Sequence, residues 1–78
     1  MYIQKECLII TFKSTTDAMA LEKYCRENNI EGRIIPLPGK ISAGCGLAWS
    51  TRPELSDFFQ KELQSANLKW ERMHVTVV

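Results

Sequence analysis

The segment that decides the fold is CLIITF, residues 7–12, together with the polar group that follows it. The segment combines apolar, β-branched and aromatic side chains without polar alternation. This pattern is typical of a central strand that is buried on both faces. Charged residues precede it at Lys5-Glu6 and a basic residue follows it at Lys13, so its length suits one strand. We therefore expect residues 7–12 to form the middle of a sheet.

A helix is predicted directly after this strand. Residues 14–17, STTD, supply side chains that accept hydrogen bonds from the first N–H groups of a helix. Ala18, Leu21 and Cys25 then recur at i, i+3 and i+7, which indicates an amphipathic helix that faces inward along this stripe and ends near residues 28–29.

Two more strands are predicted in the middle of the chain. Residues 33–37, RIIPL, form a short apolar run, and Pro36 confines that strand to an edge or to its own end because proline has no N–H to donate. Pro38-Gly39 has turn chemistry. Residues 46–50, GLAWS, are small and apolar enough for a third strand.

The last third of the sequence predicts a second helix and a fourth strand. Residues 51–54, TRPE, have capping-box spacing with an early proline, and the helix should end near Ser65. Its apolar stripe comprises Leu55, Phe58, Phe59 and Leu63. Residues 68–78 alternate as a strand does. One face of that strand carries Met73, Val75 and Val77.

The order of these elements is strand, helix, strand, strand, helix, strand. It predicts an α+β fold, a ferredoxin-like split βαβ (βαββαβ) two-layer sandwich with a four-stranded antiparallel sheet and two helices on one face. Right-handed crossovers give the spatial order fourth, first, third, second. No linker or repeat interrupts the 78 residues, so we expect one domain over residues 1–78. A chain of this length buries only about 60% of its unfolded surface.

Composition narrows the function classes. The formal net charge is +1, with ten basic and nine acidic residues spread along the chain, which leaves little electrostatic attraction for nucleic acid or an anionic membrane. No segment is apolar and long enough to cross a bilayer or to act as a signal peptide, so the expected compartment is the cytoplasm. Phosphate-binding and dinucleotide-binding motifs are missing, and no cofactor is expected.

Three widely spaced cysteines, without a CxxC pair, are expected to be reduced thiols. Cys7 begins the first strand and Cys25 lies on the inward stripe of the first helix, so both are interpreted as small core residues. His74 is the only histidine and is expected to be solvated on the sheet. These residues lack any familiar metal-ligand spacing, and no metal site is predicted.

The third cysteine lies in ISAGCGLAW, residues 41–49, between Gly44 and Gly46. The predicted topology places Cys45 at the end of the sheet where the first helix begins, and a helix N-terminus or a nearby cation lowers a thiol pKa. Support for the thiol is expected from Ser42, Ala43, Gly44 and Gly46, and its polar neighbours are expected to be Ser14, Thr15, Lys40 and Arg33. The alternative is a hairpin bend in which Cys45 is only a small packing residue.

The segments ITFKSTTDAMALEKYC (residues 10–25) and GRIIPLPGKISAGCGLAW (residues 32–49) resemble the selenium/sulfur carrier protein-like family of small bacterial domains. The resemblance extends from about Cys7 to Val75. It implies a carrier, not a turnover enzyme, that accepts sulfur or selenium on Cys45 as a persulfide or selenosulfide. The implied partners are a donor protein similar to a cysteine desulfurase and an acceptor protein.

This sequence departs from the family pattern at two positions. Family members more often have proline or arginine where Lys13 stands, and histidine where Thr16 stands. The departure at Thr16 removes an imidazole that could activate the thiol.

Two other function classes stay open at this point. The first is a small protein-binding or regulatory module that pairs through its edge strands, and a homodimer would belong to this class. The second is a thiol enzyme or redox sensor, which requires a cysteine with a depressed pKa.

Overall fold

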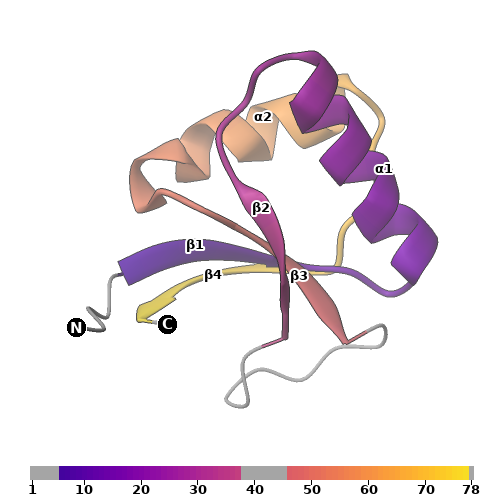
Figure 1. The fold of residues 1–78 in the computed structure, drawn as a ribbon. Helices are drawn as coiled ribbons and strands as arrows, with labels where there is room; N and C mark the ends of the chain where they lie inside the picture. The colour runs from indigo at the N-terminus through magenta and orange to yellow at the C-terminus, as the bar shows by residue number, and fades with distance from the viewer. Residues whose placement is uncertain (1–5, 38–45, 78) are drawn as a thin grey trace.

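The computed structural model describes residues 6–37 and 46–77. Their elements are β1 (Glu6–Thr11), α1 (Thr15–Glu27), β2 (Arg33–Pro36), β3 (Leu47–Thr51), the 3₁₀ turn η1 (Pro53–Leu55), α2 (Ser56–Ser65) and β4 (Arg72–Val77). The four strands form one antiparallel sheet, and both helices lie on the same side of it (Figure 1). The predicted α+β class, four-stranded antiparallel sheet and pair of helices are therefore confirmed.

The strands lie in the order β2-β3-β1-β4. Read from the β4 edge, this is the order fourth, first, third, second that the sequence predicts. In the register, Leu8 pairs with Thr51 of β3 on one side and with Val75 of β4 on the other. β1 thus has a strand on each side, as β3 does, and it is buried without interruption from Leu8 to Thr11, which agrees with its apolar sequence.

The core lies between the sheet and the helices. Its fully or almost fully buried side chains come from β1 and the residue that follows it, and from α1, β3 and α2. They are Leu8, Ile10, Phe12, Ala18, Leu21, Cys25, Trp49, Phe59 and Leu63. Burial of one large apolar side chain contributes about 1.5–3 kcal/mol. Ile9 and Thr11 on the other face of β1 are also fully buried, so β1 is buried on both faces as its sequence predicts.

Local interactions define both ends of α1. The Ser14 hydroxyl accepts a hydrogen bond from the Asp17 N–H at 3.3 Å, which confirms the predicted N-cap. At the other end the Asn28 N–H donates to the Tyr24 carbonyl at 3.1 Å, and Asn29 has a φ of 55°. Asparagine tolerates this left-handed conformation better than most residues, so the helix ends where its sequence favours the turn.

The start of the second helix differs from the prediction. Thr51 belongs to β3 and its hydroxyl donates to the Glu31 carbonyl at 2.8 Å, so it does not cap a helix. The 3₁₀ turn comes next, and α2 begins at Ser56 without a side-chain cap. Its predicted end at Ser65 is confirmed. Phe58 is 39% exposed, because adjacent helical residues point about 100° apart and Phe59 occupies the inward direction.

The fourth strand is also shorter than predicted. It begins at Arg72 rather than near Leu68. Two apolar residues of the predicted first part of the strand, Leu68 and Trp70, instead pack against the core from the connection between α2 and β4.

Candidate functional site

The predicted thiol site falls mostly outside the described residues. Cys45 lies there, as do its expected companions Lys40, Ser42, Ala43 and Gly44. The described residues on either side of this segment are Leu37 and Gly46. The Leu37 N–H donates a hydrogen bond to the Gly46 carbonyl at 2.9 Å. The residue after β2 and the residue before β3 are therefore hydrogen-bonded to each other.

Gly46, directly after Cys45 in sequence, has a left-handed backbone conformation and open space at its Cβ position. Its φ is 76°, and no heavy atom lies within 4 Å of the position that a Cβ would take. A glycine is favoured here by conformation rather than by close packing.

Ser14 and Thr15 lie at the end of the sheet to which Gly46 belongs. The β1–β3 ladder ends at the pair Thr11 and Ala48, and continuing its register by two residues places Lys13 level with Gly46. Ser14 and Thr15 follow Lys13 at the N-terminus of α1. The positive end of the α1 dipole is therefore at this end of the molecule. Contacts between these residues and Cys45 stay predictions.

Arg33 lies elsewhere. It is the first residue of β2 and pairs with Ser50, whereas Leu37 follows the last residue of the strand. At a rise of about 3.3 Å per residue, the backbone positions of Arg33 and Leu37 are roughly 13 Å apart. The structure thus places Arg33 with a different set of side chains, which line a groove at the opposite end of β2.

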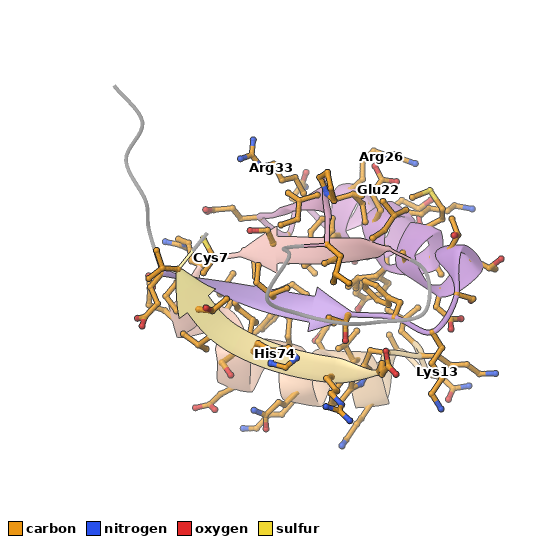
Figure 2. All side chains as sticks on the ribbon, turned by 90° about the horizontal axis from the view of Figure 1, so that it is seen from below. Cys7, Lys13, Glu22, Arg26, Arg33 and His74 are labelled. Carbon is orange, nitrogen blue, oxygen red and sulfur yellow. The ribbon has the colours of Figure 1, made fainter. Side chains whose placement is uncertain are left out.

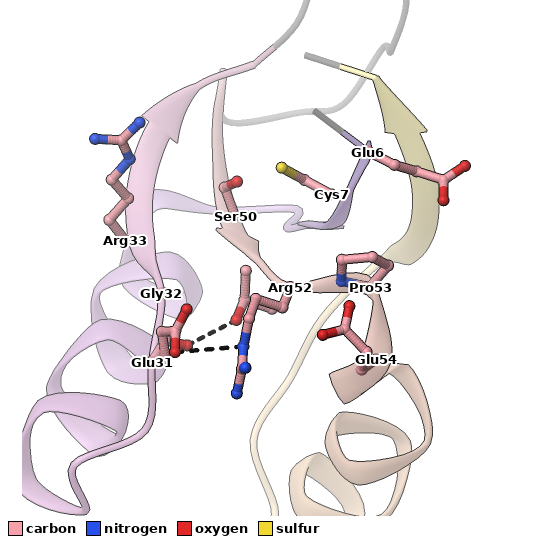
Figure 3. A pocket seen from close by; sticks show the side chains of 10 residues that line it. Glu6, Cys7, Glu31, Gly32, Arg33, Ser50, Arg52, Pro53 and Glu54 are labelled. Atoms are coloured by element: carbon pink, nitrogen blue, oxygen red, sulfur yellow. Dashed lines mark hydrogen bonds and ion pairs between the residues drawn. The ribbon is translucent and has the colours of Figure 1, made fainter. Parts of the chain in front are cut away.

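This groove has a volume of about 580 Å³. Figure 3 shows its walls, which come from β1, β2, β3 and the turn after β3. The lining residues are Glu6, Cys7, Glu31, Gly32, Arg33, Ser50, Thr51, Arg52, Pro53 and Glu54. The Cys7 side chain points into the groove toward Ser50. The prediction that Cys7 is a core residue is wrong, because it lies at the start of β1 on the face opposite Leu8 and is half-buried.

Charges of both signs surround the groove. Arg52 Nε lies 3.3 Å from Glu31 Oε1, and both side chains are more than half exposed. Water screens such a pair, so it contributes at most about 1 kcal/mol. The hydrogen bond from the buried Thr51 hydroxyl to the Glu31 carbonyl is a stronger attachment of Glu31 to β3 than this ion pair. The groove is therefore lined by the Cys7 thiol, the Ser50 hydroxyl, and both carboxylate and guanidinium groups.

Gly32 shapes this wall in a way that the sequence did not reveal. Its φ is 144°, and a Cβ would lie 2.5 Å from Cε2 and Cζ2 of the Trp49 ring. The ring can pack against the backbone only because this residue has no side chain. From the sequence, only the end of the first helix near residues 28–29 was predicted in this region.

With this geometry established, comparison with known proteins identifies the family. The model of the family described as "Putative Se/S carrier protein-like" matches residues 6–75. The chain belongs to this family. No curated protein and no solved structure matches the chain significantly. Among the helices of the described residues, none combines the length and apolar character needed to span a membrane.

Cys25 is poorly suited to carry an atom in a protein of this family. Burial, together with the nearby carboxylates of Glu62 and Glu22, raises the pKa of its thiol to about 12. A thiol with this pKa is almost entirely protonated at neutral pH, and the thiolate is the nucleophile. Cys25 is fully buried, so its predicted role as a core residue is confirmed.

His74 pairs with Ile9 on the face of the sheet away from the helices (Figure 2). The side chain is half-buried, and its Nε2 atom is buried without a hydrogen-bond partner. The prediction of a solvated side chain is therefore wrong, because the middle of β4 lies against β1. Within residues 6–37 and 46–77, no group of three or more His, Cys, Asp or Glu side chains is arranged to hold a metal ion.

Proposed function

We propose that the protein is a sulfur or selenium carrier in which Cys45 holds the transported atom. The observation that carries the proposal is the family match over residues 6–75, which includes Cys45. The Cys45 thiolate attacks the outer sulfur of a donor persulfide. A new bond forms from Cys45 to that sulfur, the donor S–S bond breaks, and the donor leaves as a thiolate. No external oxidant is needed.

Delivery is the same exchange in the other direction. A nucleophile of the acceptor protein attacks the outer atom, the bond to Cys45 breaks, and Cys45 returns to its thiolate. Transport of selenium follows the same steps through a selenosulfide. The protein is then a carrier that cycles between loaded and unloaded forms, not an enzyme acting on a small substrate.

Two observations support the choice of Cys45 over the other cysteines. Cys25 is buried and has a pKa of about 12. Cys7 lies in a groove toward the opposite end of β3 from Gly46, since β3 runs from Leu47 to Thr51 and the groove includes Thr51. Gly46 also has open space at its Cβ position, which suits the approach of a second protein.

The surroundings of the thiol are part of the proposal. The N-terminus of α1, capped by Ser14, provides a positive dipole end that favours an anion nearby. Lys40 adds a positive charge close in sequence. We propose that Thr15, Ser42, Ala43 and Gly44 complete this environment, and that docking proteins contact the same end of the sheet.

Several broader assignments belong to the same proposal. The protein acts in the cytoplasm, as one domain over residues 1–78, between a donor similar to a cysteine desulfurase and an acceptor protein. Its fold is assigned to the ferredoxin-like group, and this assignment is supported by the βαββαβ order of the elements.

The proposal is tested by loading the protein with sulfur. The protein is incubated with a cysteine desulfurase and cysteine, and its intact mass is measured without reductant. Wild type and Cys7→Ala should each gain one sulfur atom, whereas Cys45→Ala should gain none. Loading of Cys45→Ala to the wild-type level would remove Cys45 from the mechanism. Loss of loading in Cys7→Ala alone would transfer the role to the groove.

A further inference from the structure

The two edge strands of the sheet differ in how well they resist pairing with another chain. β2 has only four residues and includes Pro36, which has no N–H, and the charged Arg33. Short length, proline and charge are the features that protect a sheet edge. β4 has six residues without proline, and its single charged residue, Arg72, is at its first position. The β4 edge therefore lacks the protection that β2 has.

The main-chain groups of β4 show which residues face outward. The Arg72 N–H donates to the Thr11 hydroxyl at 3.1 Å, and the Arg72 carbonyl accepts from the same hydroxyl at 3.4 Å. Both groups of Arg72 therefore face β1. Because these directions alternate along an antiparallel strand, the N–H and carbonyl groups of Met73, Val75 and Val77 face away from β1.

The side chains of the same three residues lie on the helix side of β4. Val75 is 49% exposed and Val77 is 42% exposed, whereas Met73 packs against the core. The residues with outward main-chain groups thus also carry an incompletely buried apolar row. A partner strand that pairs here would satisfy the main chain and cover the valines together.

We propose that a second copy of this chain pairs antiparallel with β4, so that the two sheets become one. Val75 then lies opposite the partner's Val75, and Met73 lies opposite the partner's Val77. Each such pair exchanges two main-chain hydrogen bonds, and the apolar row of one copy meets the same row of the other. This two-fold arrangement is the commonest symmetry of soluble oligomers.

Charge favours a second copy as the occupant. Arg72 is the only charged residue of β4, and antiparallel pairing places the two Arg72 side chains at opposite ends of the interface. No like charges meet across the pairing. On the other face, His74 lies opposite the partner's Thr76, so polar side chains also meet polar ones.

The test is the oligomeric state, measured by sedimentation equilibrium over a range of protein concentrations. Wild type should be a dimer. Val75→Lys places two like charges opposite each other and removes an apolar contact, so it should weaken dimerisation about tenfold or more. Since Val75 is half exposed, the variant should keep the wild-type circular dichroism. The matched control is Pro36→Lys, which places a lysine at an exposed position of the β2 edge and should leave the dimer intact.

Two outcomes would overturn the proposal. A monomeric wild type at the highest concentrations would show that the β4 edge does not pair with itself. A dimer that persists unchanged in folded Val75→Lys would place the interface elsewhere. The register is tested by Val75→Cys in a Cys45→Ala background, which should form a reducible dimer on mild oxidation that the background alone does not form.

Discussion

Replacing Gly32 by alanine tests the packing that joins β2 to the core. The new Cβ would lie 2.5 Å from two carbons of the Trp49 ring, at a backbone φ of 144°. The strained backbone costs about 1–3 kcal/mol, and the crowded ring costs about 1–3 kcal/mol more. The total of roughly 4 kcal/mol is a large fraction of the stability of a domain of this size, about 4–12 kcal/mol.

Gly46→Ala is the matched control for this substitution. Gly46 also has a positive φ, but nothing lies within 4 Å of its Cβ position. Only the conformational cost applies, about 1–2 kcal/mol. With a urea dependence of about 1 kcal/mol per molar, the midpoint of Gly32→Ala should lie about 2 M below that of Gly46→Ala.

The contribution of the ring is isolated by a double-mutant cycle. Trp49→Phe removes the atoms that the Cβ would meet, so alanine at position 32 should cost less in that background, by about 1–3 kcal/mol. Circular dichroism during urea titration measures all four proteins. Equal losses for Gly32→Ala and Gly46→Ala, together with no coupling to Trp49→Phe, would refute this account of the wall.

Three further predictions concern hydrogen bonding and pH. Thr51→Val removes the donor to the Glu31 carbonyl and should lower the free energy of unfolding by about 1–3 kcal/mol; a urea titration that shows no loss would contradict the anchoring role. Tyr24→Phe removes the hydrogen bond to the Glu62 carboxylate that joins α1 to α2 and should cost about 1 kcal/mol, which thermal unfolding measures against a Lys23→Ala control. The pKa of Cys25 is raised to about 12 in the folded protein, against 9.0 for an unperturbed thiol, so the unfolded chain loses this proton at lower pH than the folded protein does. The contribution of the thiol to the free energy of unfolding should therefore be fully present below pH 9 and should decrease as the pH rises toward 12. Cys25→Ala should flatten that fall in urea titrations at pH 8 and pH 10, leaving a smaller slope from Tyr24, whose pKa is also raised by its hydrogen bond to Glu62.

The strands and the first helix were predictable because their sequences have strong, simple patterns. The apolar run of residues 7–12 fits a central strand, and the stripe of Ala18, Leu21 and Cys25 is buried as a helical period requires. The order of the strands was predicted from the rule that crossover connections between strands are right-handed.

The errors arose where tertiary contacts decide the outcome. Thr51 matched a capping box, but its hydroxyl bonds to the distant Glu31 carbonyl. Cys7 matched a core position, but it lies at the end of a strand beside a groove that only the assembled chain forms. The role of Gly32 depends on Trp49, 17 positions later in the sequence, and no local pattern signals such a contact.

The site itself was predicted from a different kind of signal. A cysteine between two glycines is unusual among packing residues, and the family resemblance predicts a chemical role for it. The match of the family model to residues 6–75 shows the family, and the role of Cys45 is a proposal. Cys45 lies outside the described residues, and chemical labelling of its thiol tests the proposed role.

The most direct measurement locates the transported atom on the chain. After loading by a cysteine desulfurase and cysteine, the protein is alkylated, digested, and analysed by mass spectrometry of its cysteine peptides. The account predicts that the extra sulfur lies on the peptide containing Cys45 and that the peptides of Cys7 and Cys25 carry only the alkyl group. An extra sulfur on Cys7, with Cys45 simply alkylated, would contradict the central claim.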